Sequence, residues 1–290
     1  MPGGLRRGRQ WMGLACLLLL LGGCALPSSG DRQALAWRLA AAAGWTALRV
    51  QADGFDMQAF VSPAFRDGGR DDTLTLYLEG DGLVTAAPYR LSLDPTPVNP
   101  VALRLALADG GRRVAWLGRP CQYPGHGPST RCRQALWSSH RYAPDVVAAV
   151  GSAIDQIKAM SGADRLRLIG YSGGAAMAAL VAAQRQDVVA WASVAGTLDT
   201  DAWVRALDLS PLRGSLNPGS VAPRLRHLPQ RHLVGEDDAV MPLAVPLAFL
   251  QAMDGGAQVA PDDVRLVRQP GFDHVCCWVR DWPRLRGQLP

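Results

Sequence analysis

The chain has 290 residues, 48% of them hydrophobic, which is enough to bury the core of one large domain. Its formal net charge is +5, but Arg6, Arg7 and Arg9 lie in an N-terminal segment that we expect to be removed, which leaves 27 basic against 25 acidic residues. This near-neutral balance, without a basic stripe containing interleaved aromatic residues, gives no indication of nucleic-acid binding.

Residues 1–23 have the pattern of an export signal. A basic start is followed by an apolar run over 11–21, which is too short to span a bilayer comfortably. The run ends in Leu21-Gly22-Gly23-Cys24, which resembles a bacterial lipobox. The resemblance implies lipidation of Cys24 and a membrane anchor on the periplasmic side of the cell envelope, and Ala25 favours the outer membrane. An ordinary signal peptide, or an uncleaved anchor with an incidental cysteine, stays open.

The rest of the chain alternates predicted strands and helices. Residues 24–45 are expected to hold the anchor, a short tether and a leading helix over 31–43. A hairpin over 46–62 around Asp53-Gly54 is followed by strands over 73–78, 113–117, 166–169, 188–194, 232–234 and 264–267. Helices are predicted over 101–108 after Asn99-Pro100, 144–160, 173–180, 243–253 and 278–285.

This alternation predicts an α/β fold with a mostly parallel central sheet, helices on both faces and an antiparallel start. One domain would cover residues 46–290. Within it, residues 197–230 break the alternation, because they are rich in proline and glycine and contain only short apolar pieces. We expect them to form an insertion or small cap over the C-terminal edge of the sheet, where open α/β sheets bind ligands.

The strand over 166–169 leads directly into a helix through Gly170-Tyr171-Ser172-Gly173-Gly174, which fits the spacing G-x-S-x-G. Such a turn strains the backbone of its central residue and requires small residues two positions away. It would raise the Ser172 hydroxyl above the sheet and point the N–H of Gly173 at negative charge forming beside it. The pattern therefore predicts a nucleophilic serine, although a glycine-rich turn with an incidental serine would look the same.

A nucleophilic serine needs a base to take its proton and an acid to hold that base. The last histidine, His274, follows a late strand, and the loop over 235–242 offers three carboxylates. These features resemble the α/β-hydrolase family, whose acid loop often reads G-x-x-D-x-x-V-P or D-x-V-V-P. The resemblance implies Asp238 as the acid, with Asp237 as the alternative. The order Ser172, Asp238, His274 is the family order of nucleophile, acid and base.

The same resemblance implies an oxyanion hole, the pair of N–H groups that would bind the negative oxygen. One donor would be Gly173, and the second would come from the loop after the third strand. The family commonly has His-Gly there, whereas this chain has Glu79-Gly80-Asp81-Gly82. We expect the N–H of Asp81, or else that of Gly82, to be the second donor. The two carboxylates would then lie near the site or point away and brace the loop, and a plain β-turn stays open.

The six cysteines have different expected fates. Cys16 leaves with the export signal and Cys24 would carry lipid. Cys121 and Cys132 bracket a loop rich in proline, glycine and histidine, so we expect a disulfide worth about 2–3 kcal/mol in an oxidising compartment. The adjacent Cys276-Cys277 could pair with each other, pair elsewhere or stay reduced. No histidine or cysteine cluster has metal-site spacing, and neither a metal nor another cofactor is expected.

These observations predict a serine hydrolase of the carboxylesterase type, anchored to the envelope by lipid and acting on a small-molecule ester or other acyl substrate. Thioester and peptide hydrolysis use the same machinery and stay open. So does a non-catalytic binding lipoprotein that keeps the hydrolase scaffold, because a fold does not fix a function. Acyl preference and oligomeric state have no signal in the sequence.

Overall fold

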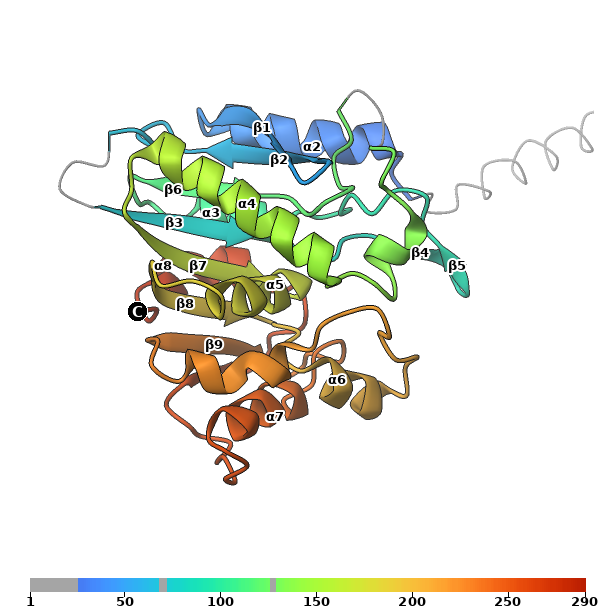
Figure 1. The fold of residues 1–290 in the computed structure, drawn as a ribbon, viewed down its shortest axis with the longest axis vertical. Coiled ribbons are helices and arrows are strands. Elements are labelled where there is room, and N and C mark those ends of the chain that lie inside the picture. Colours follow the sequence, from blue (N-terminus) through green and yellow to red (C-terminus); the bar gives the residue numbers. More distant parts are fainter. Residues whose placement is uncertain (1–25, 68–71, 126–128) are drawn as a thin grey trace, which may run out of the picture.

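The computed structural model describes residues 26–67, 72–125 and 129–290, so the predicted export signal and Cys24 lie outside the described residues. Among these residues, eight strands form one sheet in the order β1-β2-β6-β3-β7-β8-β9-β10 (Figure 1). The strands are β1 (Thr46–Ala52), β2 (Phe55–Val61), β3 (Thr73–Leu78), β6 (Val114–Leu117), β7 (Arg165–Tyr171), β8 (Val188–Val194), β9 (Gln230–Gly235) and β10 (Leu266–Gln269).

The first two strands form the predicted antiparallel hairpin, and β2 also pairs antiparallel with β6. All the other neighbours in the sheet run parallel. A mostly parallel sheet with an antiparallel start is therefore the observed architecture, as the alternation of strands and helices predicted. A separate two-stranded ribbon, β4 (Thr85–Ala87) with β5 (Arg90–Leu91), projects beside the sheet (Figure 1).

Helices cover both faces of the sheet. One face carries α4 (Pro144–Ser161), α5 (Gly173–Ala182) and α7 (Ala244–Met253), and the other carries α2 (Ser29–Ala42), α3 (Val101–Leu107) and α8 (Trp278–Arg286). The alternation of strand side chains explains the two layers. In β3, Leu74, Leu76 and Leu78 pack toward α4 and α5, while Tyr77 packs toward α3 and α8.

The position of the candidate site follows from where the strand order reverses. The chain runs from β3 to its neighbour β6 and then crosses to β7 on the other side of β3. Loops that leave the C-terminal ends of β3 and β7 therefore diverge, and ligands bind at such a point. The Glu79–Gly82 loop follows β3 and Ser172 follows β7, so the topology brings both predicted segments to one edge.

Several boundaries differ from the prediction. The second strand begins at Phe55 rather than Met57, and the last strand is displaced by two residues toward Gln269 because the turn at Asp263 occupies its expected start. Helix α3 begins after Pro100 without a side-chain cap from Asn99. The ribbon β4–β5, the short helices η1 (Gln134–Trp137) and η2 (Pro218–Leu225), and α6 (Thr200–Leu207) were not predicted.

The predicted insertion over 197–230 divides into two parts. Its first part, containing α6, lines the mouth of the pocket described below through Trp203 and Leu209. Its second part, η2, packs against α5 and α7 and buries Ala222 and Leu225 in the core. Only the first part therefore lies over the site.

Within the described ranges no helix has both the length and the apolar character needed to cross a membrane. The same residues contain no group of three or more histidine, cysteine, aspartate or glutamate side chains that could hold a metal ion.

Candidate active site

Ser172 occupies a tight turn between β7 and α5. Its backbone has φ 50° and ψ −123°, a region that residues other than glycine rarely adopt. The glycines on either side make the turn possible. A Cβ at Gly170 would lie 2.4 Å from the Cα of Ala175, and one at Gly174 would lie 2.1 Å from the carbonyl oxygen of Leu78. The spacing G-x-S-x-G is thus a steric requirement of this strand-to-helix turn.

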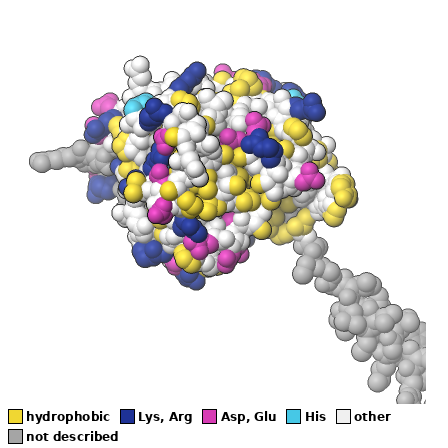
Figure 2. Space-filling model, turned by 90° about the horizontal axis from the view of Figure 1, so that it is seen from below, with side chains coloured by type: hydrophobic (Ala, Val, Ile, Leu, Met, Phe, Trp, Pro, Cys, Tyr) yellow, Lys and Arg dark blue, Asp and Glu magenta, His cyan; other side chains and the backbone are white. Residues whose placement is uncertain are grey.

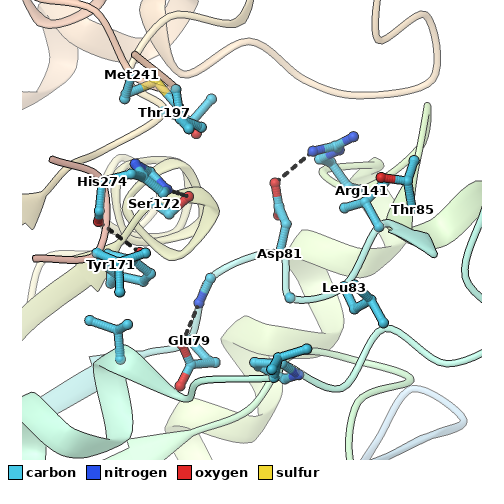
Figure 3. Close-up of a pocket in the computed structure, with 18 of the residues that line it drawn as sticks. Glu79, Asp81, Leu83, Thr85, Arg141, Tyr171, Ser172, Thr197, Met241 and His274 are labelled. Carbon is cyan, nitrogen blue, oxygen red and sulfur yellow. Dashed lines mark hydrogen bonds and ion pairs between the residues drawn. The ribbon is translucent and has the colours of Figure 1, made fainter. Parts of the chain in front are cut away.

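The structure places the three residues predicted for catalysis next to one another (Figure 3). His274 Nε2 lies 3.1 Å from Ser172 Oγ, and His274 Nδ1 lies 2.9 Å from Asp238 Oδ2. The other oxygen of Asp238 accepts hydrogen bonds from the N–H groups of Val240 and Met241 at 2.9 and 2.8 Å. Its side chain is only 1% exposed, whereas the neighbouring Asp237 is exposed. Asp238, not Asp237, is therefore the partner of His274.

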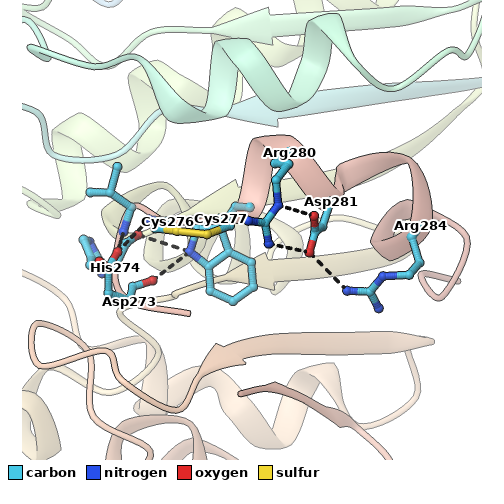
Figure 4. The surroundings of a disulfide bond; sticks show 9 residues. Asp273, His274, Cys276, Cys277, Arg280, Asp281 and Arg284 are labelled. Atoms are coloured by element: carbon cyan, nitrogen blue, oxygen red, sulfur yellow. Dashed lines mark hydrogen bonds and ion pairs between the residues drawn. A yellow bond between two sulfur atoms is a disulfide. The ribbon is translucent and has the colours of Figure 1, made fainter. Parts of the chain in front are cut away.

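The loop that carries His274 is fixed at several points (Figure 4). The Tyr171 hydroxyl donates to the His274 carbonyl oxygen at 2.9 Å (Figure 3). Trp278 Nε1 donates to the same oxygen at 3.2 Å. Asp273 accepts from the N–H groups of Val275 and Cys276. These contacts hold the imidazole ring over Ser172.

Two disulfide bonds join four of the described cysteines. Cys276 and Cys277, left open by the sequence, are joined to each other just before α8. The expected bond between Cys121 and Cys132 is present in the structure.

The peptide between Gly80 and Asp81 is held in one orientation beside the serine. A Cβ at Gly80 would lie 3.4 Å from Ser172 Cβ, so the loop passes close to the nucleophile position. The buried Gln122 side chain donates to the Gly80 carbonyl oxygen at 2.8 Å. Because C=O and N–H point opposite ways across a trans peptide, the N–H of Asp81 points away from Gln122.

The N–H groups of this loop divide into engaged and free donors. The N–H of Gly80 donates to Glu79 Oε1, and the N–H of Leu83 donates to the Pro95 carbonyl oxygen. Those of Asp81 and Gly82, the two predicted candidates, have no acceptor among the described residues. Across the site, the N–H of Gly173 belongs to the first turn of α5, where helix N–H groups lack intrahelical partners.

The carboxylate of Glu79 turns away from the serine and braces two elements. It accepts hydrogen bonds from the N–H groups of Ala102 and Leu103 at the start of α3 and from Trp116 Nε1 on β6. Burial raises the pKa of Glu79 to about 7, against the opposing effect of these donors. Glu79 thus caps the start of α3, which has no side-chain cap from Asn99.

The carboxylate of Asp81 points toward two arginines, as Figure 3 shows for Arg141. It lies 3.0 Å from Arg119 Nη1, 2.8 Å from Arg141 Nη1 and 2.9 Å from the Tyr142 hydroxyl. Burial alone would raise the pKa of Asp81, but the charges of Arg141 and Arg119 outweigh it and hold the pKa below its usual value. The negative charge of Asp81 is therefore paired with two buried positive charges.

A pocket of about 660 Å³ opens beside Ser172 and His274. Its wall is largely apolar, with Leu83, Val98, Leu209, Val240, Met241 and Val275 among the lining residues. Apolar walls around a few convergent polar groups are typical of small-molecule sites.

Sequence reasoning did not identify Arg119, Gln122, Arg141 or Tyr142 as part of this site. Their partners lie 38 to 61 residues away in the chain. A local pattern cannot encode such distances.

No protein-family model matches the chain, and no curated protein sequence matches it. Solved structures match its fold at low sequence identity. An alpha-beta serine hydrolase homologue from Coxiella burnetii has a TM-score of 0.53 at 17% identity, covering 83% of this chain and 94% of that one. Est1E from Butyrivibrio proteoclasticus has a TM-score of 0.56 at 13% identity, with 84% and 96% covered.

Naproxen esterase (carboxylesterase NP) from Bacillus subtilis has a TM-score of 0.54 at 12% identity, covering 91% of this chain and 97% of that chain. At these identities the likeness concerns the fold. The chain has the α/β-hydrolase fold, with a mostly parallel sheet between two helical layers.

Proposed function

We propose that the protein is a serine hydrolase of the carboxylesterase type, with Ser172 as nucleophile, His274 as base and Asp238 as the acid that orients it. The observation that carries this proposal is the continuous hydrogen-bonded chain from Asp238 through His274 to Ser172 at the wall of an apolar pocket. The fold it shares with proteins described as esterases and a serine hydrolase homologue supports it.

The geometry supports a two-step acyl transfer. The Nδ1–H of His274 donates a hydrogen bond to Asp238, which leaves the Nε2 lone pair free. Nε2 accepts the Ser172 proton as Oγ attacks the acyl carbonyl. The N–H groups of Gly173 and Asp81 stabilise the negative oxygen that forms, with Gly82 as the alternative donor. His274 then gives its proton to the leaving alcohol, and water, activated by the same imidazole, releases the acyl group from Ser172.

An ester is the proposed substrate because it needs the least assistance for departure of the leaving group. The pocket supports this choice, since its apolar wall suits an acyl chain and its polar groups gather near Ser172.

The decisive experiment measures hydrolysis of p-nitrophenyl esters of graded chain length by wild type, Ser172→Ala and His274→Ala. We expect wild-type turnover and loss of activity in both folded variants, by roughly a thousandfold or more. A fluorophosphonate probe should label wild type and not Ser172→Ala. A folded protein with native disulfides that neither turns over esters nor takes the label would be a binding lipoprotein on this scaffold. Turnover of peptide amides above esters would instead indicate a peptidase.

We also propose that lipid on Cys24 anchors the protein to the cell envelope, on the periplasmic side of the outer membrane. The apolar run over 11–21 followed by Leu21-Gly22-Gly23-Cys24 supports this location. Labelling cells with a radioactive fatty acid should mark the wild-type protein but not Cys24→Ser. Equal labelling of the two would exclude this cysteine as the lipidation site.

A further inference from the structure

The large hydrophobic side chains that the described residues expose are concentrated at two neighbouring pockets. Four of them, Val98, Leu209, Val240 and Val275, line the pocket of Ser172. Three more, Leu26, Tyr89 and Leu93, line a second pocket of about 750 Å³. Val264 is the one such side chain of the described ranges that lines neither pocket. We call the first seven the apolar rim.

The two pockets form one continuous region. Leu83 lines both of them, and β4 lies between them, with Thr85 in the wall of the first and Ala86 in the wall of the second. Figure 2 shows hydrophobic side chains gathered across one face of the molecule and at its end. Exposed apolar surface that is gathered in this way marks an interaction site rather than the scattered apolar residues of an ordinary surface.

The β4–β5 ribbon and the residues just after it have three features that point to contact with a partner. Tyr89 is fully exposed and adopts φ 59°, a left-handed conformation that is strained for a bulky side chain. Leu93 is 90% exposed. Arg90 is exposed, and its side chain makes no hydrogen bond or ion pair with another described residue. Neither core packing nor charge pairing within the described part of the chain explains these side chains.

We propose that the apolar rim rests on the surface of an anionic lipid bilayer, so that ester lipids enter the pocket of Ser172 from the membrane. A tyrosine with an adjacent arginine at the edge of an apolar surface matches the chemistry of the membrane–water interface, where an aromatic ring sits at headgroup level and a cation meets anionic lipid. Leu26, a member of the rim, also lies two residues after Cys24, the proposed lipidation site.

The second half of this proposal, the entry of ester lipids, rests on the proposed hydrolase function. The first half, contact between the rim and a bilayer, does not. The test therefore measures insertion and hydrolysis separately.

Insertion is tested with the full chain carrying Ser172→Ala, reconstituted in vesicles of phosphatidylcholine and phosphatidylglycerol. One version adds Tyr89→Trp and a matched control adds Val264→Trp, which places the same reporter at an exposed apolar position outside the rim. We expect the emission added by Tyr89→Trp to be quenched by lipids with brominated acyl chains, and that added by Val264→Trp to be unaffected. Equal quenching at both positions, or none at Tyr89→Trp, would overturn the proposal.

Hydrolysis is tested with the double variant Tyr89→Ser/Leu93→Ser, because neither residue lines the pocket of Ser172. We expect hydrolysis of a long-chain ester embedded in the vesicles to fall about tenfold, since two interfacial apolar side chains are lost. Hydrolysis of a soluble acetate ester should stay at the wild-type level, and Val264→Ser should change neither rate. Equal loss on both substrates would contradict entry from the membrane.

Two further results have clear meanings. If Tyr89→Ser/Leu93→Ser converts a self-associated protein into a monomer, the rim binds a second copy of the chain and the proposal is overturned. Quenching at Tyr89→Trp together with no Ser172-dependent hydrolysis of any ester would retain the membrane surface and reject the hydrolase function.

Discussion

Two adjacent aspartates follow β9, and their environments separate their roles. Asp238 is buried, accepts two backbone N–H groups and faces His274, whereas Asp237 is exposed and contributes only its backbone N–H to the Phe272 carbonyl oxygen. Asp238→Asn would replace the carboxylate that sets the tautomer of His274. We expect kcat to fall by about a thousandfold or more in this variant.

Asp237→Asn is the matched control for that variant, because it makes the same chemical change one residue away. We expect less than a twofold effect on kcat, as for a surface substitution. Steady-state kinetics on one ester measures both. A larger loss from Asp237→Asn than from Asp238→Asn would reverse the assignment of the acid.

Glu79 makes the stability of the protein depend on pH in an unusual direction for a carboxylate. Its pKa of about 7 in the folded state lies above the usual 4.5, so the folded protein holds the proton more tightly than the unfolded chain. Its contribution to stability is therefore complete below pH 4.5 and is lost as the pH rises through 7. Above pH 7 the free energy of unfolding should be lower by about 3 kcal/mol than below pH 4.5.

Urea unfolding of wild type and Glu79→Gln across this pH range isolates the effect, because the other titrating groups are common to both proteins. The free energy of unfolding of wild type minus that of Glu79→Gln should decrease as pH rises. A difference that stays constant or increases with pH would show that the four N–H donors keep Glu79 ionised.

At the scale of elements, the loop after β6 fixes the orientation of a peptide in the loop after β3. Gln122 accepts from the N–H of Arg119 and donates to the Gly80 carbonyl oxygen, so it fixes the peptide whose N–H belongs to Asp81. Gln122→Met removes both bonds at similar side-chain length. We expect kcat to fall about 10- to 100-fold with little change in KM, because the lost orientation matters mainly when the oxyanion forms.

Gln156→Met on α4 provides the control, since this glutamine is exposed and bonds only to the Gln51 carbonyl oxygen. It should leave both kinetic constants unchanged. If Gln122→Met raised KM and left kcat unaltered, the Gly80–Asp81 peptide would bind ground-state substrate and would not be an oxyanion donor.

The elements that sequence could predict are those with a local physical signature. Periodicity and apolar runs predicted the long strands and helices. The steric demand of a strand-to-helix turn predicted the position of Ser172. The ribbon β4–β5 was missed because strands of three and two residues carry no periodicity. The capping of α3 by Glu79 was missed because its donors lie 23 and 24 residues away.

The candidate site shows the same limit. Ser172, Asp238 and His274 each follow a strand in an order known for the fold, so their proximity could be anticipated. The pairing of Asp81 with Arg119 and Arg141 depends on how loops from β3 and β6 and the segment before α4 fold together. Sequence therefore placed two carboxylates beside the proposed oxyanion site, and only the three-dimensional arrangement shows which partners they have.

At the scale of the whole molecule, the Cys121–Cys132 bond joins the site to the outer surface. Cys121 and Tyr123, which flank Gln122, both have positive φ, at 71° and 54°, so the segment is strained and must be held by its surroundings. We expect Cys121→Ser/Cys132→Ser to lower the free energy of unfolding by about 2–3 kcal/mol and to lower kcat.

A double-mutant cycle with Gln122→Met tests the route of this effect. If the bond acts on kcat through Gln122, the combined variant should be no slower than Gln122→Met alone. Additive losses would show that the bond and the glutamine act independently.

The position of this bond has a consequence for the cell that makes the protein. Cytoplasmic thiols are kept reduced, whereas the periplasm is oxidising. If the chain is exported as we propose, a newly synthesised copy would hold the Gly80–Asp81 peptide loosely until it reaches the periplasm. The proposed hydrolase would gain its full activity only after leaving the compartment of its synthesis, and the esters of the producing cell's own cytoplasm would be protected from it.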